Sequence, residues 1–461
     1  MVSTASRVRT SLAIGTALGT IVASLLMAPR STTSDEPTRV DGGMPVTARL
    51  ITSRIQSQAQ QQNLVVTFTA PDLPTGGSVR RPALSLAIVI DRSGSMHGAP
   101  IENAKAAALS VIRQLDSRDA FSVVTYSSSA ETVIEMQRAT EANKAAARAA
   151  IETIDDDGGT CISCGLEAGA IQVAVRREHR SETLDDRGVR RILLISDGQA
   201  NEGVYDRNDL ARLAASTSAR GVSISTVGVG LDFDEQTMRR LAEVGRGNYY
   251  FVEDTVALSQ MFVAELAMLS QTVAADVQLI ATPGPGVQIE EVHGYPMTRA
   301  GDRVVVPIAD LRAGESRKVV LRVALAAAHT ASRVVADVDV GWHQVSDGAQ
   351  RRAHATAVVD IVDDPATVAA SMDTPTMIAV EQALSARALE DAAAAYEQRG
   401  VEGAKQILDR RTRAVRANAA RLGAKAAGEL EAVSSDAIDG FTKAPAQAKK
   451  AASVNAYKLS R

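Results

Sequence analysis

Cysteine, histidine and aromatic residues are scarce in this chain of 461 residues. It contains two cysteines and six histidines, and aromatic residues make up 3% of the composition. The cysteines, Cys161 and Cys164, are separated by two residues, so they cannot tie distant parts of a fold together. No histidine falls in an H-E-x-x-H or H-x-x-x-H arrangement, which excludes the commonest zinc-hydrolase motifs.

No charge of one sign predominates either. Lys and Arg number 50 against 54 Asp and Glu, which gives a net charge of -4, and hydrophobic residues make up 45% of the chain. This composition is typical of a globular protein and excludes a disordered or polycationic chain. The length predicts about three domains. The overall charge therefore indicates no class of partner.

The chain has one long apolar run without charge, at residues 12–28. It predicts that residues 1–29 form a signal peptide or a membrane anchor and that residues 30–44 form a disordered spacer. Leu26 breaks the small-x-small cleavage pattern, so both cleavage and retention stay open. We expect an exported protein of the cell envelope, in the periplasm or at the cell surface, anchored by residues 12–28 if these are retained. Basic and aromatic residues are not interleaved, so no nucleic-acid partner is expected.

Apolar strands and helical periods alternate between residues 82 and 270. Helices are expected near residues 100–115, 141–154, 163–177, 207–219 and 234–244. This alternation, with near-continuous apolar strands, predicts an α/β fold with a doubly wound, mainly parallel sheet.

Strand patterns flank this α/β domain on both sides. Residues 45–81 contain too few strands for a stable unit, and residues 271–363 contain short strands separated by Gly and Pro turns. We predict that residues 45–81 join a β-sandwich domain at 271–363, and that the α/β domain is inserted in this sandwich or flanked by it. Residues 364–461 are rich in Ala and predict a C-terminal α-helical segment, with a break at Gly400 and Gly403.

Oxygen-bearing side chains stand where the predicted strands end. The first strand runs into Asp91, Ser93 and Ser95 at alternating positions. Thr160 follows two glycines, and Asp197 follows another apolar strand. The carboxyl ends of parallel strands form the ligand crevice of such a sheet. Neither a G-x-G-x-x-G nor a P-loop pattern occurs, and an all-oxygen set of this kind suits a hard divalent cation.

The D-x-S-x-S, G-G-T and S-D-G motifs, in this order, resemble a von Willebrand factor type A domain with a complete metal-ion-dependent adhesion site. The resemblance covers residues 82–270. It implies that the hydroxyls of Ser93, Ser95 and Thr160 coordinate the cation, and that Asp91 and Asp197 act directly or through water. Magnesium is expected first, with calcium or manganese as alternatives. The layout is similar to bacterial exported proteins likened to calcium-activated chloride channel regulators or inter-α-trypsin inhibitor heavy chains.

Charge counting predicts what such a site does. Two carboxylates leave a divalent ion nearly neutral, and hydroxyl ligands leave it able to accept an Asp or Glu side chain from a protein partner. We expect no general base, nucleophile or histidine beside the site, and therefore no enzyme. The predicted function is metal-dependent protein binding or adhesion at the cell envelope. A structural subunit of an envelope assembly is an alternative, and the oligomeric state is left open.

Cys161 and Cys164 directly follow Thr160 and allow three interpretations. A zinc site would need two further ligands at suitable spacing, which are absent. A thiol-disulfide redox pair would make the protein an enzyme of another class. A disulfide across one helical turn is favoured in an exported protein and adds about 2 kcal/mol of stability. We further expect that its oxidation shifts the loop that carries Thr160.

Two charged clusters remain. Asp155, Asp156 and Asp157 form either a solvated turn or an auxiliary cation site. A basic run in the C-terminal segment comprises Arg410, Arg411, Arg413, Arg416, Arg421 and Lys425. An apolar stripe runs through it at Val401, Leu408, Val415 and Leu422. We expect a solvated helix that packs this stripe on a neighbour, with docking to an anionic surface or a partner helix as the alternative.

Overall fold

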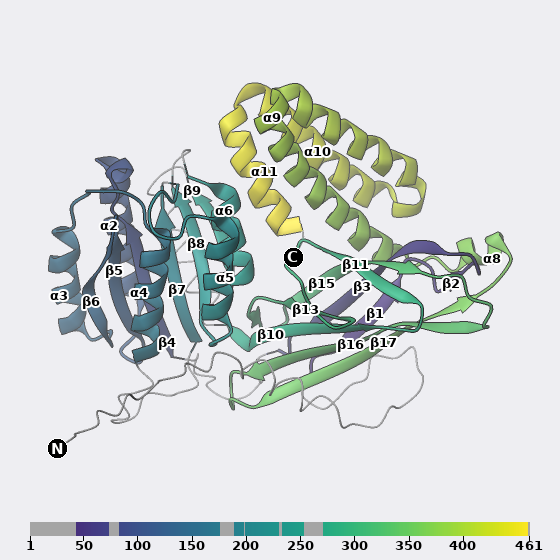
Figure 1. Cartoon of the computed structure of the whole chain (residues 1–461), viewed down its shortest axis with the longest axis horizontal. Coiled ribbons are helices and arrows are strands. Elements are labelled where there is room, and N and C mark those ends of the chain that lie inside the picture. The colour runs from purple at the N-terminus through teal and green to yellow at the C-terminus, as the bar shows by residue number, and fades with distance from the viewer. Residues whose placement is uncertain are drawn as a thin grey trace, which may run out of the picture. The chain divides into compact units, whose positions relative to one another are not determined.

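A computed structural model of the chain describes residues 43–72, 83–175, 189–197, 199–229, 233–252 and 271–459 (Figure 1). The predicted leader, and the spacer up to residue 42, lie outside the described residues. None of the helices in the described ranges combines the length and apolarity needed to cross a membrane.

A six-stranded sheet in the order β6-β5-β4-β7-β8-β9 forms the centre of the α/β domain. Its strands are β4 (Leu84–Asp91), β5 (Ala120–Tyr126), β6 (Ala130–Arg138), β7 (Val189–Ser196), β8 (Ser223–Val229) and β9 (Arg246–Val252). All neighbours pair in parallel except β6, which runs antiparallel to β5 at one edge. Every residue of β4 is buried, as expected for a central strand covered on both faces. The predicted mainly parallel sheet is confirmed.

Helices cover both faces of this sheet (Figure 1). They are α2 (Ala99–Gln114), α3 (Glu141–Glu152), α4 (Ile162–Val175), α5 (Arg207–Ser218) and α6 (Glu235–Val244), and a short 3-10 turn, η1 (Gly94–Met96), precedes α2. Successive residues of β4 alternate between the two faces. Ile88 packs with α2 and α3, whereas Val89 packs with α4, α5 and α6. The five expected helices are therefore all present, and the sheet is doubly wound.

Two sheets form the β-sandwich, and their strands pair antiparallel except for β2, which pairs in parallel with β17. One has the order β1-β3-β15-β11, and the other has the order β12-β13-β10-β16-β17-β2, with β14 paired to β10. The strands are β1 (Val46–Leu50), β2 (Arg54–Ile55), β3 (Gln60–Thr69), β10 (Thr272–Pro283), β11 (Val287–His293), β12 (Thr298–Ala300), β13 (Arg303–Pro307), β14 (Leu311–Arg312), β15 (Ser316–Leu325), β16 (Ser332–Gln344) and β17 (Gln350–Ile361). β3 pairs with β15 along its full length. Strands from both sides of the α/β domain thus share a sheet, which confirms the insertion.

The C-terminal segment is helical, as predicted. Its helices are α8 (Pro365–Ala370), α9 (Thr374–Leu422), α10 (Ala424–Lys443) and α11 (Pro445–Leu459). Gly400 has φ 63° and breaks α9 where a break was expected, while Gly403 lies within the helix. A second break at Gly423, with φ 83°, was not predicted. The apolar stripe packs inward, since Leu408, Val415 and Leu422 are buried.

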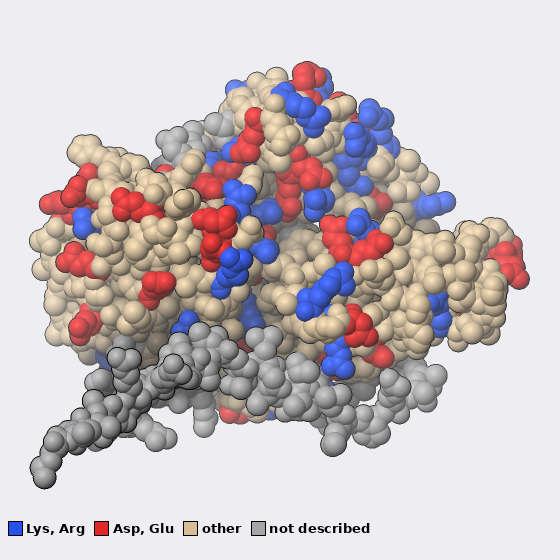
Figure 2. All heavy atoms as spheres, in the orientation of Figure 1, with Lys and Arg blue, Asp and Glu red and all other residues tan. Residues whose placement is uncertain are grey.

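The expectation of a solvated basic run needs one correction. Arg411 is buried, and it donates hydrogen bonds to the Glu381 carboxylate and to Ser385 Oγ. Its charge is therefore neutralised inside the helical segment, as buried guanidinium groups require. Other members of the run stay exposed, and Lys and Arg side chains gather over these helices in Figure 2.

The β-sandwich contacts the α/β domain at the amino ends of its strands. Arg191, near the start of β7, forms an ion pair with Asp310 at 3.3 Å, and both side chains are buried. Ser223, the first residue of β8, donates a hydrogen bond of 2.9 Å to the same carboxylate. Burial raises the pKa of Asp310, although Arg191 acts in the opposite direction. The carboxyl ends of the strands therefore lie at the opposite edge of the sheet from this contact.

The last helix, α11, docks on the α/β domain through a buried lysine. Lys450 Nζ lies 2.5 Å from Glu235 Oε2, donates to the carbonyl oxygen of Phe233, and lies 3.9 Å from the centre of the Phe233 ring. Near the other end of α11, the Tyr457 hydroxyl donates to the carbonyl of Gly247 at 2.7 Å. Charge, hydrogen bonds and aromatic contact together fix α11 against α6 and β9.

Removal of Glu235 tests this contact. Glu235→Ala leaves Lys450 buried without its carboxylate, so the free energy of unfolding should fall by about 3 kcal/mol in urea denaturation. Asp439→Ala is the control, because it removes an exposed ion pair with Lys443 on α10 and should cost less than about 0.5 kcal/mol. Equal losses in the free energy of unfolding would contradict a stabilising role of the buried pair of Glu235 and Lys450.

The same pair predicts a dependence on pH. Burial pushes the pKa of Glu235 up, but hydrogen bonds from Lys449 and Lys450 hold it below its ordinary value. A lowered pKa contributes stability above the unfolded pKa of about 4.3, and this stability is lost as pH falls through the folded value. The difference in the free energy of unfolding between the wild type and Glu235→Ala should therefore shrink below that pH, as measured in urea titrations.

Candidate functional site

Three neighbouring strands bring polar side chains to one edge of the sheet. β4 ends at Asp91, which is level with Tyr126 at the end of β5, and β7 ends at Ser196. The buried Asp91 carboxylate accepts hydrogen bonds from Ser196 Oγ at 2.7 Å, from the Tyr126 hydroxyl at 3.2 Å and from the Ser93 amide at 2.9 Å. Burial raises the pKa of Asp91, and these hydrogen bonds oppose the rise. Asp91 thus joins three segments at the base of the site.

The hydroxyls of the D-x-S-x-S motif converge on Asp197. Ser93 Oγ lies 3.1 Å from Ser95 Oγ, and Ser95 Oγ lies 2.8 Å from Asp197 Oδ1. Adjacent oxygens of an octahedral magnesium shell, at about 2.1 Å from the metal, are about 3.0 Å apart. Ser93 and Asp197 are buried, whereas Ser95 is exposed, so the group opens to solvent. The spacing and the chemistry of these oxygens fit a small, hard cation.

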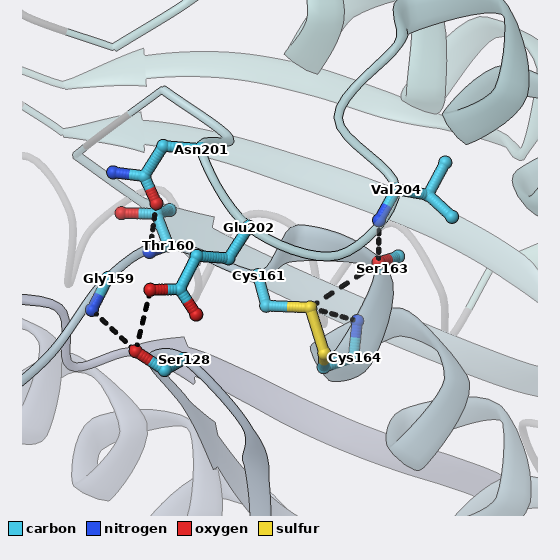
Figure 3. Close-up of a disulfide and its surroundings, with 9 residues drawn as sticks. All are labelled: Ser128, Gly159, Thr160, Cys161, Ser163, Cys164, Asn201, Glu202 and Val204. Carbon is cyan, nitrogen blue, oxygen red and sulfur yellow. Dashed lines mark hydrogen bonds between the residues drawn. A yellow bond between two sulfur atoms is a disulfide. The ribbon is translucent and has the colours of Figure 1, made fainter.

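Thr160 lies on the adjoining loop and is held there by its backbone. Its amide donates to Asn201 Oδ1 at 2.7 Å, and its carbonyl accepts from the amide of Asn201 at 3.1 Å (Figure 3). The Gly94 amide donates to the Gly158 carbonyl at 3.0 Å, which joins this loop to the D-x-S-x-S loop. The structure therefore links Asp91, Ser93, Ser95 and Asp197 by direct hydrogen bonds and brings in Thr160 through its loop.

Carboxylates, histidines and cysteines alone do not form a metal cluster in the described part of the chain. No group of three or more His, Cys, Asp or Glu side chains in those residues is placed to hold a metal ion. A cation at the sheet edge must therefore use Ser and Thr oxygens beside carboxylates, which suits magnesium or calcium better than zinc. The role of the five residues as ligands stays a prediction.

Three neighbours of the site were given no role by the sequence patterns, although Ser196 is the first residue of the S-D-G motif. Tyr126 and Ser196 hold Asp91, and Asn201 holds the backbone of Thr160. Ser196 and Tyr126 could have been found from their positions at strand ends beside β4, because parallel neighbours end at the same edge. Asn201 carries no comparable signal, because its contact joins two loops across 41 positions of sequence.

Cys161 and Cys164 form a disulfide at the start of α4 (Figure 3). The two sulfurs are bonded to each other, so no thiolate remains for zinc. Gly203, with φ 64°, packs against Cys161, and the Val204 amide donates to Ser163 Oγ at 3.0 Å. The disulfide-bonded turn therefore supports the loop at 199–206, which in turn holds the backbone of Thr160.

The acidic turn before Thr160 contacts a histidine. His97 Nδ1 lies 3.2 Å from Asp156 Oδ2, and the His97 side chain is 85% exposed. His97 thus pairs with the acidic turn that precedes Thr160. The Asp157 amide donates to the Arg92 carbonyl at 2.7 Å, so the turn also braces the D-x-S-x-S loop.

Comparison with known proteins agrees with this geometry. Residues 85–264 match the family model described as von Willebrand factor type A domain. An uncharacterized protein of Synechocystis is 26% identical over 279 residues, which cover 58% of this chain and 64% of that protein. Inter-alpha-trypsin inhibitor heavy chain H2 of Sus scrofa is 28% identical over 187 residues, which cover 40% of this chain and 20% of that protein.

A solved structure described as von Willebrand factor type A from Catenulispora acidiphila has a TM-score of 0.69 and 18% identity to this chain. The match covers 90% of this chain and 96% of that one, and it shows a shared fold. The chain spans less than two thirds of the length of the curated relatives named above. The type A domain inferred from the motifs is confirmed, and such domains generally mediate metal-dependent protein interaction.

Gly203 tests the support that the disulfide gives to the 199–206 loop. A Cβ at this position would overlap Cys161 Sγ and lie 2.7 Å from Ser163 Oγ, in addition to the strain of a positive φ. Gly203→Ala should lower the free energy of unfolding by about 3 kcal/mol in urea denaturation.

Gly301→Ala is the matched control for this substitution. Gly301 has φ 67°, but no atom lies within 4 Å of a Cβ built there, so the control measures backbone strain alone. It should cost about 1 to 2 kcal/mol. If Gly203→Ala costs no more than Gly301→Ala, the contact with the disulfide does not constrain the loop.

Proposed function

We propose that the von Willebrand factor type A domain of this chain binds a divalent cation at the carboxyl edge of its sheet and captures a protein partner through that ion. Ser93, Ser95 and Thr160 would offer hydroxyls, and Asp91 and Asp197 would act directly or through water. The observation that carries the proposal is the convergence of Ser93, Ser95 and Asp197 within hydrogen-bond distance beside an exposed opening.

The carboxylates of Asp91 and Asp197 differ in how free they are to bind the cation. Asp91 already accepts three hydrogen bonds and is fully buried, so its role is to fix Ser93 and to supply negative charge beneath the ion. Asp197 Oδ1 accepts from the exposed Ser95, which places this carboxylate nearer the opening. When bound, the cation would supply an electrophilic centre for an Asp or Glu of the partner.

Magnesium is the proposed ion, with calcium or manganese as alternatives. Oxygen spacings of 2.8 and 3.1 Å suit the short metal-oxygen distance of magnesium, whereas calcium prefers longer ones. The β-sandwich contact at Arg191 and Asp310 supports the proposal further, because it leaves the site edge to a partner.

The proposed setting is the cell envelope. The apolar run at residues 12–28 supports export, and its retention would anchor the domain at a membrane. A structural subunit, in which the ion only locks an assembly, is the neighbouring alternative. A redox enzyme is disfavoured because Cys161 is fully buried behind the 199–206 loop, which leaves only the half-buried Cys164 open to attack by an external thiol.

Loss of one hydroxyl tests the metal site. Ser95→Ala should weaken magnesium binding at least about tenfold in isothermal titration calorimetry, since the exposed Ser95 can be truncated without loss of core packing. Asp91→Ala should abolish binding, and chelator should then make no difference to partner capture. Ser216→Ala, an exposed serine on α5, is the control and should bind as the wild type does. Magnesium affinity unchanged in Ser95→Ala would refute the site.

Reduction of the disulfide tests its coupling to the site. Reduced Cys161 and Cys164 should weaken magnesium binding severalfold, because the 199–206 loop that holds Thr160 rests on the bonded turn. Calorimetry with and without a phosphine reductant measures this, with circular dichroism to check the fold. Equal affinity in both states would contradict the coupling. Dithiol-dependent reductase activity that survives Asp91→Ala would favour the redox enzyme instead.

A further inference from the structure

Val204 and Tyr205 are large apolar side chains that the fold leaves in solvent. Their exposed fractions are 40% and 67%. The comparably exposed Ile171 and Val358 lie in α4 and β17, whereas Val204 and Tyr205 adjoin each other in the loop that follows Asp197. An aromatic ring held in water costs free energy that the fold does not recover. Tyrosines in such positions are enriched among residues that dominate binding energy.

The loop presents these side chains from a fixed backbone. The Val204 amide is bound by Ser163 Oγ, and the Val204 side chain points away from the disulfide in Figure 3. On the other side of Tyr205, the Asp206 carboxylate caps α5 by accepting from the amides of Asn208 and Asp209 at 2.9 and 3.1 Å. Tyr205 is thus held between two anchored neighbours. A surface fixed in this way loses little conformational entropy when a partner binds.

The loop is also tied directly to the predicted cation site. Asn201 holds the backbone of Thr160 through two hydrogen bonds, and Glu202 accepts from Ser128 Oγ at 2.9 Å (Figure 3). The same chain segment therefore begins at the ligand Asp197, touches Thr160 and then exposes Val204 and Tyr205. A partner that reaches the ion is expected to meet these apolar side chains next.

The charges around the opening limit what that partner carries. Asp155 and Asp157 are exposed on the Thr160 loop, and Glu202 lies half-buried beside Gly159. Arg92 is a half-buried cation in the adjoining loop. Carboxylates therefore predominate at the rim, and they repel any acidic group of the partner beyond the one that binds the ion.

From these observations, and resting on the proposed function, we infer that the partner is a peptide segment with a single acidic residue flanked by an apolar residue. The acidic side chain completes the cation shell, and the apolar one packs on Val204 and Tyr205. A run of acidic residues is excluded by the carboxylates at the rim. Val204 and Tyr205 are accordingly specificity-determining residues of the site.

Biotinylated Gly-Ser peptides with one central Glu test this inference with the full chain in biolayer interferometry, with magnesium or with chelator. The Glu is flanked by Phe, by Ser or by further Glu. The Phe-flanked peptide should bind about tenfold more tightly than the Ser-flanked one, which corresponds to roughly 55 Å² of apolar surface removed from water. The Glu-flanked peptide should bind more weakly than the Ser-flanked one.

Three variants assign the preference to the loop. Tyr205→Ser should remove the Phe preference while magnesium binding in calorimetry stays as in the wild type. Tyr205→Phe should retain the preference, and Val358→Ser, which truncates an apolar side chain on the β-sandwich, should not change it. Magnesium-dependent binding that is equal for all peptides, or a Phe preference that survives Tyr205→Ser, would overturn this inference alone. If no peptide binds in a magnesium-dependent way, the proposed function fails and the inference fails with it.

Discussion

One buried carboxylate organises the edge of the sheet on which the candidate site depends. Asp91 ends the central strand and is fully enclosed, so its charge must be met by donors from the protein or by a cation. Tyr126 from β5, Ser196 from β7 and the Ser93 amide all point to it. Three segments that are far apart in sequence are thereby fixed relative to each other. The same contacts position Ser93 and, through it, Ser95, so the candidate site is preorganised.

Buried ion pairs connect the α/β domain to the β-sandwich and to α11. The buried pair of Arg191 and Asp310 mounts the α/β domain on the β-sandwich by the amino ends of its strands. Lys450 of α11 pairs with Glu235, the first residue of α6. Both are charged contacts with their partners supplied, which avoids the cost of an isolated buried charge. The Arg191–Asp310 pair lies at the opposite end of the strands from Asp91 and Asp197, whereas the α11 contact lies at the start of α6, after the carboxyl end of β8.

Periodicity and strand ends predicted much of this from sequence. Apolar spacing predicted five helices and the parallel sheet. The rule that ligands gather at the carboxyl ends of strands pointed to the five predicted site residues. The break at Gly423 was missed although a glycine with positive φ is a common local signal for a helix end. The edge strand β6 and the burial of Arg411 could not be predicted from periodicity. Each depends on pairing with residues that no local pattern specifies, as Arg411 does with Glu381 thirty positions upstream. Tyr205 was missed for the opposite reason, because its exposure shows only once the core is assembled.

The insertion of the α/β domain has a consequence for the order in which the chain folds. β3 pairs with β15 across the whole inserted domain, and Tyr457 reaches back to Gly247 across 210 positions. Such a high contact order slows folding, because long loops must close before these contacts form. During synthesis from the amino terminus, β3 can pair with β1, but its other edge stays open until residues 316–325 emerge. The apolar residues from Leu64 to Phe68 make this open edge prone to aggregate in that interval, so the nested topology calls for protection of the nascent chain.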